Sequence, residues 1–232
     1  MSKRINNIFS RISGNYDLMN RLLSFGVDKG WRRNTVSDII ATSKGRKELK
    51  ILDIATGTGD LAIELSMELE RSGISAQVTG MDFNSAMLAF AGPKAGKAGA
   101  DVKFEFGDAL RMKYKDSTFD VLTSGFALRN FDDLDRFAKE SHRILKRGGS
   151  FVFVDMAIPD KAHQRAFFRV YSVFMRFMGL FVDNESYAWL VRSIRTFDKK
   201  ALVRTMSRAG FKDVRYRELK SGIAYIIAGR KN

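Results

Sequence analysis

The chain has 232 residues, of which 45% are hydrophobic, which is enough for one globular domain with a substantial core. It has no cysteine, which excludes disulfides, thiolate nucleophiles and cysteine-ligated metals, and its two histidines, His142 and His163, lie too far apart in sequence to suggest a metal site. The formal net charge of +14 favours an anionic partner, either nucleic acid or an anionic membrane surface, unless the basic residues only solvate the surface.

The sequence contains neither a membrane-spanning segment nor a signal peptide. No apolar stretch reaches the roughly 18 residues that cross a bilayer, and the N-terminus has no apolar core. We therefore expect a cytoplasmic protein, with peripheral contact to the inner face of the membrane as an open alternative. A homodimer also stays open.

The first 48 residues should be mainly helical, because apolar residues recur at the spacing of one helix face, at Ile5, Ile8, Phe9 and Ile12. The segment Tyr16–Ser24 mixes apolar and polar residues. It is either an ordinary packing helix or part of a lid, residues 1–48, that folds over a ligand site. In the second case the candidate substrate contacts are Tyr16, Asp17 and Asn20.

The stretch Leu49–Gly59 predicts a buried strand, a tight glycine turn and the start of a helix. Gly57 and Gly59 let the backbone turn sharply and approach a ligand closely. Such a unit is the nucleotide-binding end of a doubly wound α/β domain, in which ligands lie beyond the carboxyl ends of the strands.

The acidic residues around this turn favour S-adenosylmethionine over a dinucleotide. A third glycine is missing, and Asp60 and Glu64 place negative charge in the first helical turn, where a pyrophosphate would otherwise bind. S-adenosylmethionine has no phosphate and carries cationic groups that suit Asp53 and Asp60. Asp82 ends the next strand, as a ribose-binding acid does. Each acid could instead only cap a helix or a turn.

The next elements are predicted as a helix to Ser72, a strand Gln77–Met81, a helix Ser85–Ala91, a loop Gly92–Gly99 and a strand Val102–Phe106. The third strand should end beside the adenine. There Asp108 could accept a hydrogen bond from the amino group, or it could be a solvated turn residue.

Phe119–Thr123 is the predicted fourth strand, and its exit should lie beside the transferred methyl group. Arg129 and Asn130 are therefore the candidate catalytic residues, with a structural ion pair as the alternative role for Arg129. A helix Asp132–Leu145 should stop at Gly148-Gly149, before a fifth strand Ser150–Asp155.

The segment Ala166–Val182 is apolar almost all round, with a narrow polar stripe at Arg165, Arg169, Ser172 and Arg176. A helix packed in the core is the simpler interpretation. A Met- and Phe-rich insertion could also hold an isoprenoid tail or rest on lipid, with the arginines at the headgroups.

A last helix, Phe197–Ala209, precedes a hairpin, Asp213–Leu219 and Gly222–Ala228. The predicted fold is one domain, residues 1–232, in the α/β class. It is a Rossmann-like, class I methyltransferase fold with a seven-stranded, mostly parallel sheet, a C-terminal antiparallel hairpin and a helical insertion at 160–197 for the substrate.

Several motifs resemble the ubiquinone and menaquinone biosynthesis C-methyltransferase family over nearly the whole chain. They are Y-D-L-M-N-R-L-L-S-F-G at Tyr16–Gly26, L-D-I-A-T-G-T-G-D at Leu52–Asp60, G-F-A-L-R-N at Gly125–Asn130, R-I-L-K-R-G-G at Arg143–Gly149 and S-I-R-T-F at Ser193–Phe197. The chain departs from the family pattern at Asp28, Gly125, Arg147 and Asp155-Met156-Ala157.

The resemblance implies S-adenosylmethionine as the cofactor, contacted at Thr58, Asp82, Asp108 and Ala109 and near Gly125. It implies a reduced polyprenyl quinone precursor as the substrate, with demethylmenaquinol first and methylation at a ring carbon. Such a carbon attacks the sulfonium methyl only when the adjacent phenol is ionised or hydrogen-bonded as a phenolate. Arg129 could stabilise that oxyanion, Asn130 could hold the oxygen, and Asp108 or Asp17 could take the proton through water.

Other acceptors are the rival interpretations. An RNA methyltransferase would suit the basic charge, but no RNA-binding module or N-P-P-Y-type motif is present, so we expect no nucleic-acid partner. A small phenol or catechol could be held near Phe126 and Tyr187. A non-enzymatic, membrane-associated binding protein is the weakest alternative.

Overall fold

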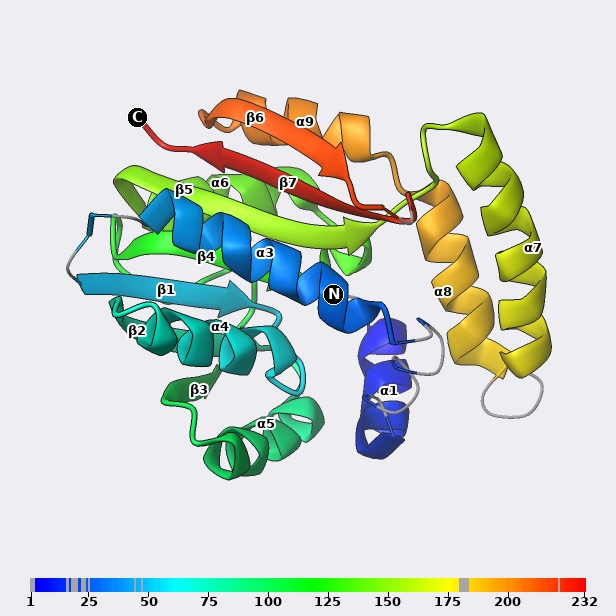
Figure 1. The fold of residues 1–232 in the computed structure, drawn as a ribbon, viewed down its shortest axis with the longest axis horizontal. Helices are drawn as coiled ribbons and strands as arrows, with labels where there is room; N and C mark the ends of the chain where they lie inside the picture. Colours follow the sequence, from blue (N-terminus) through cyan, green and yellow to red (C-terminus); the bar gives the residue numbers. More distant parts are fainter. Residues whose placement is uncertain are drawn as a thin grey trace.

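The computed structural model describes residues 3–15, 17, 21, 24, 26–43, 45–46, 48–179, 184–220 and 222–232. Its centre is a seven-stranded sheet with the order β3-β2-β1-β4-β5-β7-β6 (Figure 1). The strands are β1 (Glu48–Ile54), β2 (Ser75–Asp82), β3 (Val102–Phe106), β4 (Phe119–Gly125), β5 (Leu145–Met156), β6 (Lys212–Glu218) and β7 (Ala224–Arg230).

The first five strands pair in parallel, and β7 pairs antiparallel with both β5 and β6. The predicted sheet and its closing hairpin are therefore confirmed. The strand order reverses at β1 and β4, which are neighbours in the sheet. Their carboxyl ends consequently border the crevice in which ligands of such folds bind.

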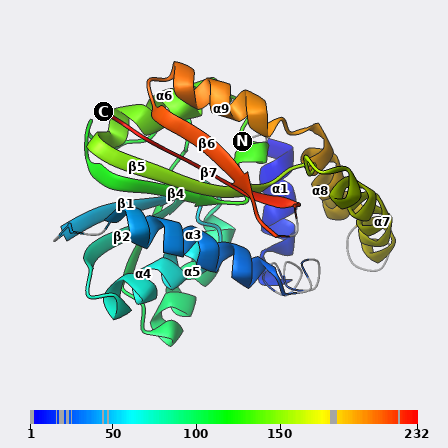
Figure 2. The same cartoon turned by 45° about the horizontal axis from the view of Figure 1, so that its top comes forward.

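Helices cover both faces of the sheet (Figure 2). The described helices are α1 (Lys3–Ile12), α3 (Asp28–Ser43), α4 (Asp60–Arg71), α5 (Ser85–Ala98), α6 (Leu134–Ile144), α7 (Ala162–Gly179), α8 (Asn184–Thr196) and α9 (Lys199–Arg208), with 3-10 turns η1 (Ser13–Asn15) and η2 (Leu128–Asn130). One buried cluster joins the sheet to α3 and α4, and another joins it to α6 and α9. Two apolar layers thus hold the strand ends in place.

Two glycine signals were misread in the sequence. The predicted loop Gly92–Gly99 is wrong, because α5 continues to Ala98 and ends at Gly99 in a left-handed cap, with Pro93 inside it. Ala91 and Ala95 are buried on one side of this helix. The burial of these good helix formers outweighs the weak helix propensity of the glycines and proline around them.

The predicted stop at Gly148-Gly149 is also wrong, because α6 ends at Ile144 and β5 begins at Leu145. The two glycines lie inside β5 instead, where the pairing with β4 shifts its register. A Cβ on Gly149 would lie 2.8 Å from the carbonyl oxygen of Lys146 in the same strand and 2.9 Å from that of Asp120 in β4, so crowding by the backbone of both strands explains the glycine.

Helices α7 and α8 form a pair at one end of the molecule, with α8 between α7 and the sheet (Figure 1). The interpretation of residues 166–182 as a core-packed helix is only half right. Phe168, Ser172 and Met175 are buried, whereas Phe167, Val170 and Val173 on the opposite side are exposed. Among the described residues, no helix combines the length and apolarity that crossing a membrane would require.

Candidate functional site

The glycine turn after β1 has the geometry that the sequence predicted. Gly57 and Gly59 have φ angles of 59° and 84°, in the left-handed region that side chains rarely adopt. A Cβ on Gly59 would also lie 2.8 Å from the ring of Phe104. The turn therefore brings bare backbone to the carboxyl end of β1 and starts α4 at Asp60.

Asp82, the last residue of β2, is fixed beside this turn. Its Oδ2 accepts a hydrogen bond from the Gly57 amide at 2.7 Å, and its Oδ1 accepts one from the Asn84 amide at 2.7 Å. Burial raises the pKa of Asp82, although the backbone hydrogen bonds oppose the shift. Each carboxylate oxygen keeps a second lone pair for a ligand hydroxyl.

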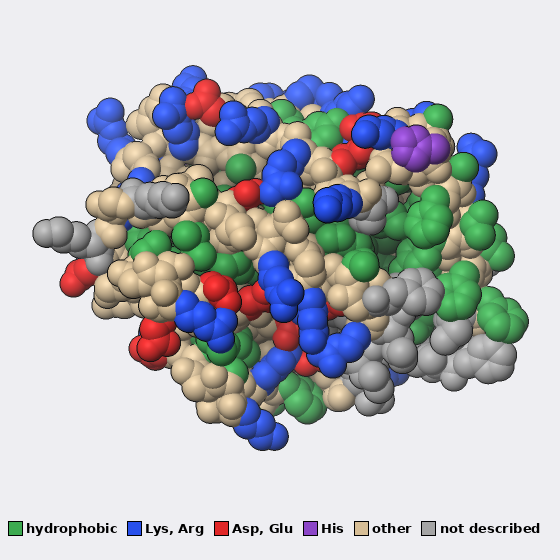
Figure 3. Space-filling view, viewed as in Figure 1, with side chains coloured by type: hydrophobic (Ala, Val, Ile, Leu, Met, Phe, Trp, Pro, Cys, Tyr) green, Lys and Arg blue, Asp and Glu red, His purple; other side chains and the backbone are tan. Residues whose placement is uncertain are grey.

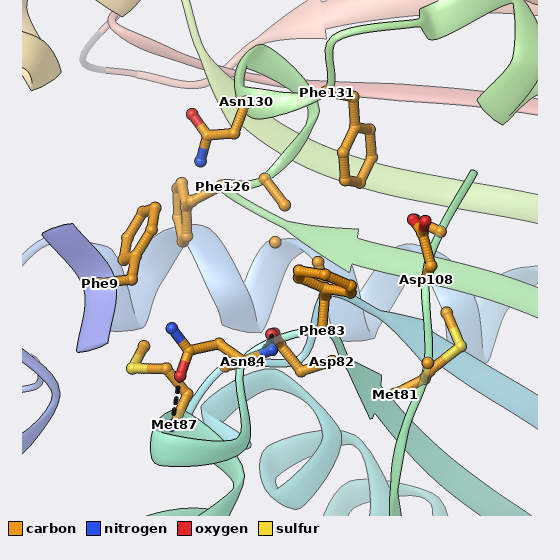
Figure 4. Close-up of a pocket in the computed structure, with 16 residues that line it drawn as sticks. Phe9, Met81, Asp82, Phe83, Asn84, Met87, Asp108, Phe126, Asn130 and Phe131 are labelled. Carbon is orange, nitrogen blue, oxygen red and sulfur yellow. Dashed lines mark hydrogen bonds between the residues drawn. The ribbon is translucent and has the colours of Figure 1, made fainter. Parts of the chain in front are cut away.

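A cavity of about 610 Å³ lies beyond the ends of β1, β2 and β4 and is called the first cavity (Figure 4). Seven of the predicted site residues line it: Gly57, Asp82, Asp108, Ala109, Gly125, Phe126 and Asn130. Among the described residues that line it, there is no lysine or arginine, so its fixed charges are carboxylates.

Three predicted cofactor residues, Asp53, Thr58 and Gly59, do not line the first cavity. Asp53 is buried behind the turn, where its Oδ2 accepts a hydrogen bond from Thr56 Oγ1 at 2.6 Å. Burial raises the pKa of Asp53 to about 7, and the nearby charge of Asp82 adds to the shift. Asp53 therefore supports the glycine turn through its hydrogen bond with Thr56 and does not face the first cavity.

Asp17 ties the N-terminal segment to the same turn. Its Oδ1 accepts a hydrogen bond from Thr58 Oγ1 at 2.6 Å, and its other oxygen pairs with Lys94 of α5. Lys94 also pairs with Asp60, so the carboxylate expected to attract a cationic cofactor is already neutralised by a lysine. Tyr16 and Asn20, the other predicted contacts here, lie outside the described residues.

The predicted catalytic residue Asn130 points toward the first cavity from η2, opposite Asp82 and Phe83 (Figure 4). It is buried, and its Oδ1 has no hydrogen-bond partner among the described residues. A buried amide oxygen without a partner is costly, so this atom is a candidate for contact with a ligand donor.

Strained backbone borders the cavity on two neighbouring strands. Ala55, after β1, and Phe126, after β4, have φ angles of 57° and 61° without being glycine. Such residues cost about 1–3 kcal/mol each and cluster at functional sites. The strain at Phe126 directs the chain from β4 into η2 and so positions the residues that follow it.

Arg129 lies in a buried ion pair with Asp155 of β5, and both side chains are almost completely shielded from solvent. Its Nη1 also donates to the carbonyl oxygen of Phe126 at 2.7 Å, and its Nε donates to Ser193 Oγ at 3.3 Å. Trp189 stacks on the guanidinium, with its ring centre 5.7 Å away. The remaining nitrogen, Nη2, makes no hydrogen bond with a described residue.

A second cavity of about 520 Å³ adjoins the first, and the two share Phe126 as a wall. It is mostly apolar and is lined by Ser24, Asp28, Trp31, Arg32, Phe126, Arg129, Met156, Tyr171, Met175, Leu190 and Ile194. Helices α3, α7 and α8 supply most of these residues. This arrangement suits an apolar molecule that presents a polar group toward Arg129 or Asp28.

Among the described residues that line the second cavity, Asp28 is the one carboxylate. It accepts hydrogen bonds from Ser24 Oγ at 2.7 Å and from Arg32 Nη1 at 2.9 Å. Burial alone would raise the pKa of Asp28, but the hydrogen bond from Ser24 and the charge of Arg32 outweigh it and hold the pKa below its usual value. Asp28 is therefore ionised at neutral pH.

The sequence interpretation missed most of the second cavity. Tyr187, a predicted substrate contact, lines neither cavity and packs with Met175 and Val191 in a small buried cluster. The signal that was available was the Met- and Phe-rich insertion, whose residues Tyr171 and Met175 do line the cavity. In the described part of the chain, no three His, Asp or Glu side chains are grouped closely enough to hold a metal ion.

The sequence of the chain is similar to those of known methyltransferases. The model of the ubiE/COQ5 methyltransferase family matches residues 1–231. The demethylmenaquinone methyltransferase of Deinococcus radiodurans is 40% identical over 231 residues, which cover 98% of this chain and 92% of that protein. The demethylmenaquinone methyltransferase of Thermus thermophilus is 41% identical over 228 residues, which cover 96% of this chain and 99% of that protein.

Solved structures agree on the architecture. A SAM-dependent methyltransferase of Thermotoga maritima superposes with a TM-score of 0.66 over 97% of this chain and 99% of that one, at 19% sequence identity. Similarity at this low identity shows the shared fold alone, since one fold can host different activities.

Proposed function

The chain belongs to the ubiE/COQ5 methyltransferase family, and from that premise we propose that it transfers a methyl group from S-adenosylmethionine to a ring carbon of demethylmenaquinol. The observation that carries the proposal is the pair of adjoining cavities that share Phe126. The first cavity has carboxylates and the amide oxygen of Asn130 without a described partner, and the second is mostly apolar with two arginines and a carboxylate in its lining. A polar methyl donor and an apolar acceptor would therefore meet at this residue.

The first cavity fits S-adenosylmethionine by its donor set. Asp82 is held by two backbone amides and can still accept hydrogen bonds from ribose hydroxyls. The described lining has carboxylates and no basic side chain, which suits a cationic ligand without phosphate. When bound, S-adenosylmethionine supplies a methyl group on a positively charged sulfur.

The second cavity would hold the quinol ring, with Arg129 beside its oxygen. The ion pair with Asp155 and the bond to the Phe126 carbonyl fix the guanidinium and leave Nη2 to donate to that oxygen. A fixed donor stabilises the negative charge on the ring oxygen, which makes the adjacent carbon nucleophilic. Asn130 would hold the oxygen or a bridging water from the side of the first cavity.

Proton balance requires an acceptor near the ring. Ionisation of the hydroxyl releases one proton before the ring carbon bonds to the methyl carbon and the bond from that carbon to sulfur breaks. The ring carbon then loses its own hydrogen as a proton and the ring oxygen takes a proton back, which restores the aromatic quinol, so one proton in total leaves the site. Asp28 is ionised and lines the second cavity, so it is a candidate to accept a hydrogen bond from the ring hydroxyl. Its lowered pKa makes it a weak base, so the proton would pass on to water.

A polyprenyl quinol resides in lipid, so the function also implies a meeting with a membrane. The net charge of +14 favours peripheral contact with an anionic surface over an encounter in solution. We include this contact in the proposal.

The two-cavity assignment is tested by filling one cavity at a time. Ile194→Trp places a larger side chain in the second cavity, and Ala109→Trp places one in the first. We expect Ile194→Trp to raise the KM for a short-tailed demethylmenaquinol while the Kd for S-adenosylmethionine stays unchanged, and Ala109→Trp to abolish cofactor binding. Equal effects of both variants on both ligands would contradict it.

A further inference from the structure

The outer side of α7 is an apolar surface that is exposed in the described part of the chain. It comprises Phe167, Val170, Val173, Phe174 and Phe177, and is called the outer face of α7. Val170 and Val173 are 72% and 68% exposed, and Phe167 is 59% exposed. At about 100° per residue the five side chains fall within about 120° of the helix circumference, so they form one stripe.

The space-filling view shows this end of the molecule as a gathering of hydrophobic side chains over α7 and α8 (Figure 3). Figures 1 and 2 agree that α7 is the outermost helix there, with α8 between it and the sheet. Contiguous exposed apolar surface of this kind marks a site of interaction with a protein or a membrane.

Charge indicates which of these partners fits. Helix α7 contains three arginines, Arg165, Arg169 and Arg176, and no acidic residue. Arg165 and Arg169 are exposed, and by helical spacing they lie along one edge of the outer face. Arg169 makes no ion pair with a described residue. An apolar stripe edged by cations is the pattern of a helix that lies in the headgroup region of an anionic bilayer.

The opposite side of α7 connects the outer face to the site. Tyr171 and Met175 line the second cavity, so the same helix is exposed on one side and forms a wall of that cavity on the other. This step rests on the proposed function, because it takes the second cavity as the place of the quinol ring. The lipid and the ring site would then be separated by the thickness of one helix, α7.

We propose that the outer face of α7 is the surface by which the protein docks on an anionic phospholipid bilayer, with Val170 and Val173 inserted among the acyl chains and Arg169 at the headgroup phosphates. The docked helix then places the wall of the second cavity that Tyr171 and Met175 form next to the membrane surface.

Vesicle co-sedimentation of the full chain tests this, with vesicles of phosphatidylglycerol and phosphatidylcholine against vesicles of phosphatidylcholine alone. The test variant is Val170→Asp with Val173→Asp. The control is Phe90→Asp, which changes an exposed apolar residue of α5, outside both cavities. We expect wild type and control to bind the anionic vesicles equally, and the double variant to bind more than tenfold more weakly.

Arg169→Gln should weaken binding to the anionic vesicles about fivefold and leave the weak binding to neutral vesicles unchanged, since one basic residue near such a surface contributes about a factor of five. The assay contains neither quinol nor cofactor, so its result is independent of the proposed reaction. Methyl transfer to a tail-less demethylnaphthoquinol should be equal in wild type and the double variant, which shows that the variant is folded.

Two results would overturn the docking proposal. The first is equal vesicle binding by the double variant and Phe90→Asp. The second is a wild-type dimer that becomes monomeric in the double variant by light scattering while vesicle binding is retained, because the outer face would then join two copies of the chain.

Discussion

Variants of the Arg129–Asp155 ion pair should separate the structural role of Arg129 from its catalytic role. Asp155 is fully buried, so Arg129→Met leaves a carboxylate without a counter-charge in the interior. Breaking a buried pair in this way costs about 3–5 kcal/mol of folding free energy. For a chain of this size each kcal/mol lowers Tm by about 2–4 °C, so we expect a fall of about 6–20 °C.

The double variant Arg129→Met with Asp155→Asn removes both charges and should recover most of that loss, because no buried charge is then left unpaired. Activity should not recover with it. If Nη2 of Arg129 stabilises the developing oxyanion, the double variant stays about 10²–10³-fold slower in kcat at saturating substrate.

Thermal unfolding and single-turnover methyl transfer, measured on the same preparations, check both halves of this expectation. Asp155→Asn alone serves as the comparison variant, since it retains the guanidinium group but removes the carboxylate that pairs with it. A double variant that regains both its Tm and its kcat would refute the catalytic role and leave Arg129 as a structural residue only.

Three further expectations concern the cofactor turn. Asp82→Asn should raise the Kd for S-adenosylmethionine about tenfold or more in calorimetry, since a hydrogen bond to a charged group is worth about 1.5–3 kcal/mol; an unchanged Kd would remove Asp82 from the ribose site. Asp53 binds its proton more tightly in the folded than in the unfolded chain, so the stability of wild type relative to Asp53→Asn should fall as the pH rises from 3.8 to about 7. If the difference in free energy of unfolding between the two proteins is the same at every pH in denaturant titrations, the pKa is not raised. Gly59→Ala should lower the free energy of unfolding by more than 1 kcal/mol, because Gly59 has a φ of 84° and its Cβ would meet Phe104 at 2.8 Å. Gly92→Ala inside α5, where a Cβ meets nothing within 4 Å, should instead raise the free energy of unfolding by up to about 1 kcal/mol. Similar changes in the two variants would contradict this expectation.

The parts of the fold that local pattern controls could be predicted from the sequence. The buried strand before Gly57, the acid at the end of β2 and the closing hairpin follow from apolar runs, turn glycines and alternation, all of which are short-range signals. The sequence analysis placed Asp82 and Asn130 in the candidate site, and both line the first cavity, while their roles there stay predictions.

The errors arose where long-range packing overrides local signals. Gly92 and Pro93 resemble a loop in sequence, yet burial of Ala91 and Ala95 holds them in a helix. Gly149 resembles a helix stop in sequence, yet it lies in β5, where neighbouring backbone leaves no room for a Cβ atom.

The second cavity could not be read from the sequence, because its walls come from α3, α7 and α8, which are distant along the chain. Asp28 and Arg32 belong to a helix before the first strand, and no local pattern relates them to Ile194. The pairing of Arg129 with Asp155 likewise joins the exit of β4 to the end of β5. The sequence raised the ion pair as an alternative for Arg129 but could not identify its partner.

The most direct measurement is methyl transfer from radiolabelled S-adenosylmethionine to a panel of acceptors: short-tailed demethylmenaquinol, a demethylated benzoquinol, tRNA and simple catechols. The account predicts label on the ring carbon of the naphthoquinol and a rate that falls in the Arg129→Met with Asp155→Asn variant. Label confined to tRNA or catechol, with both quinols untouched, would contradict the assignment of the second cavity to a quinol.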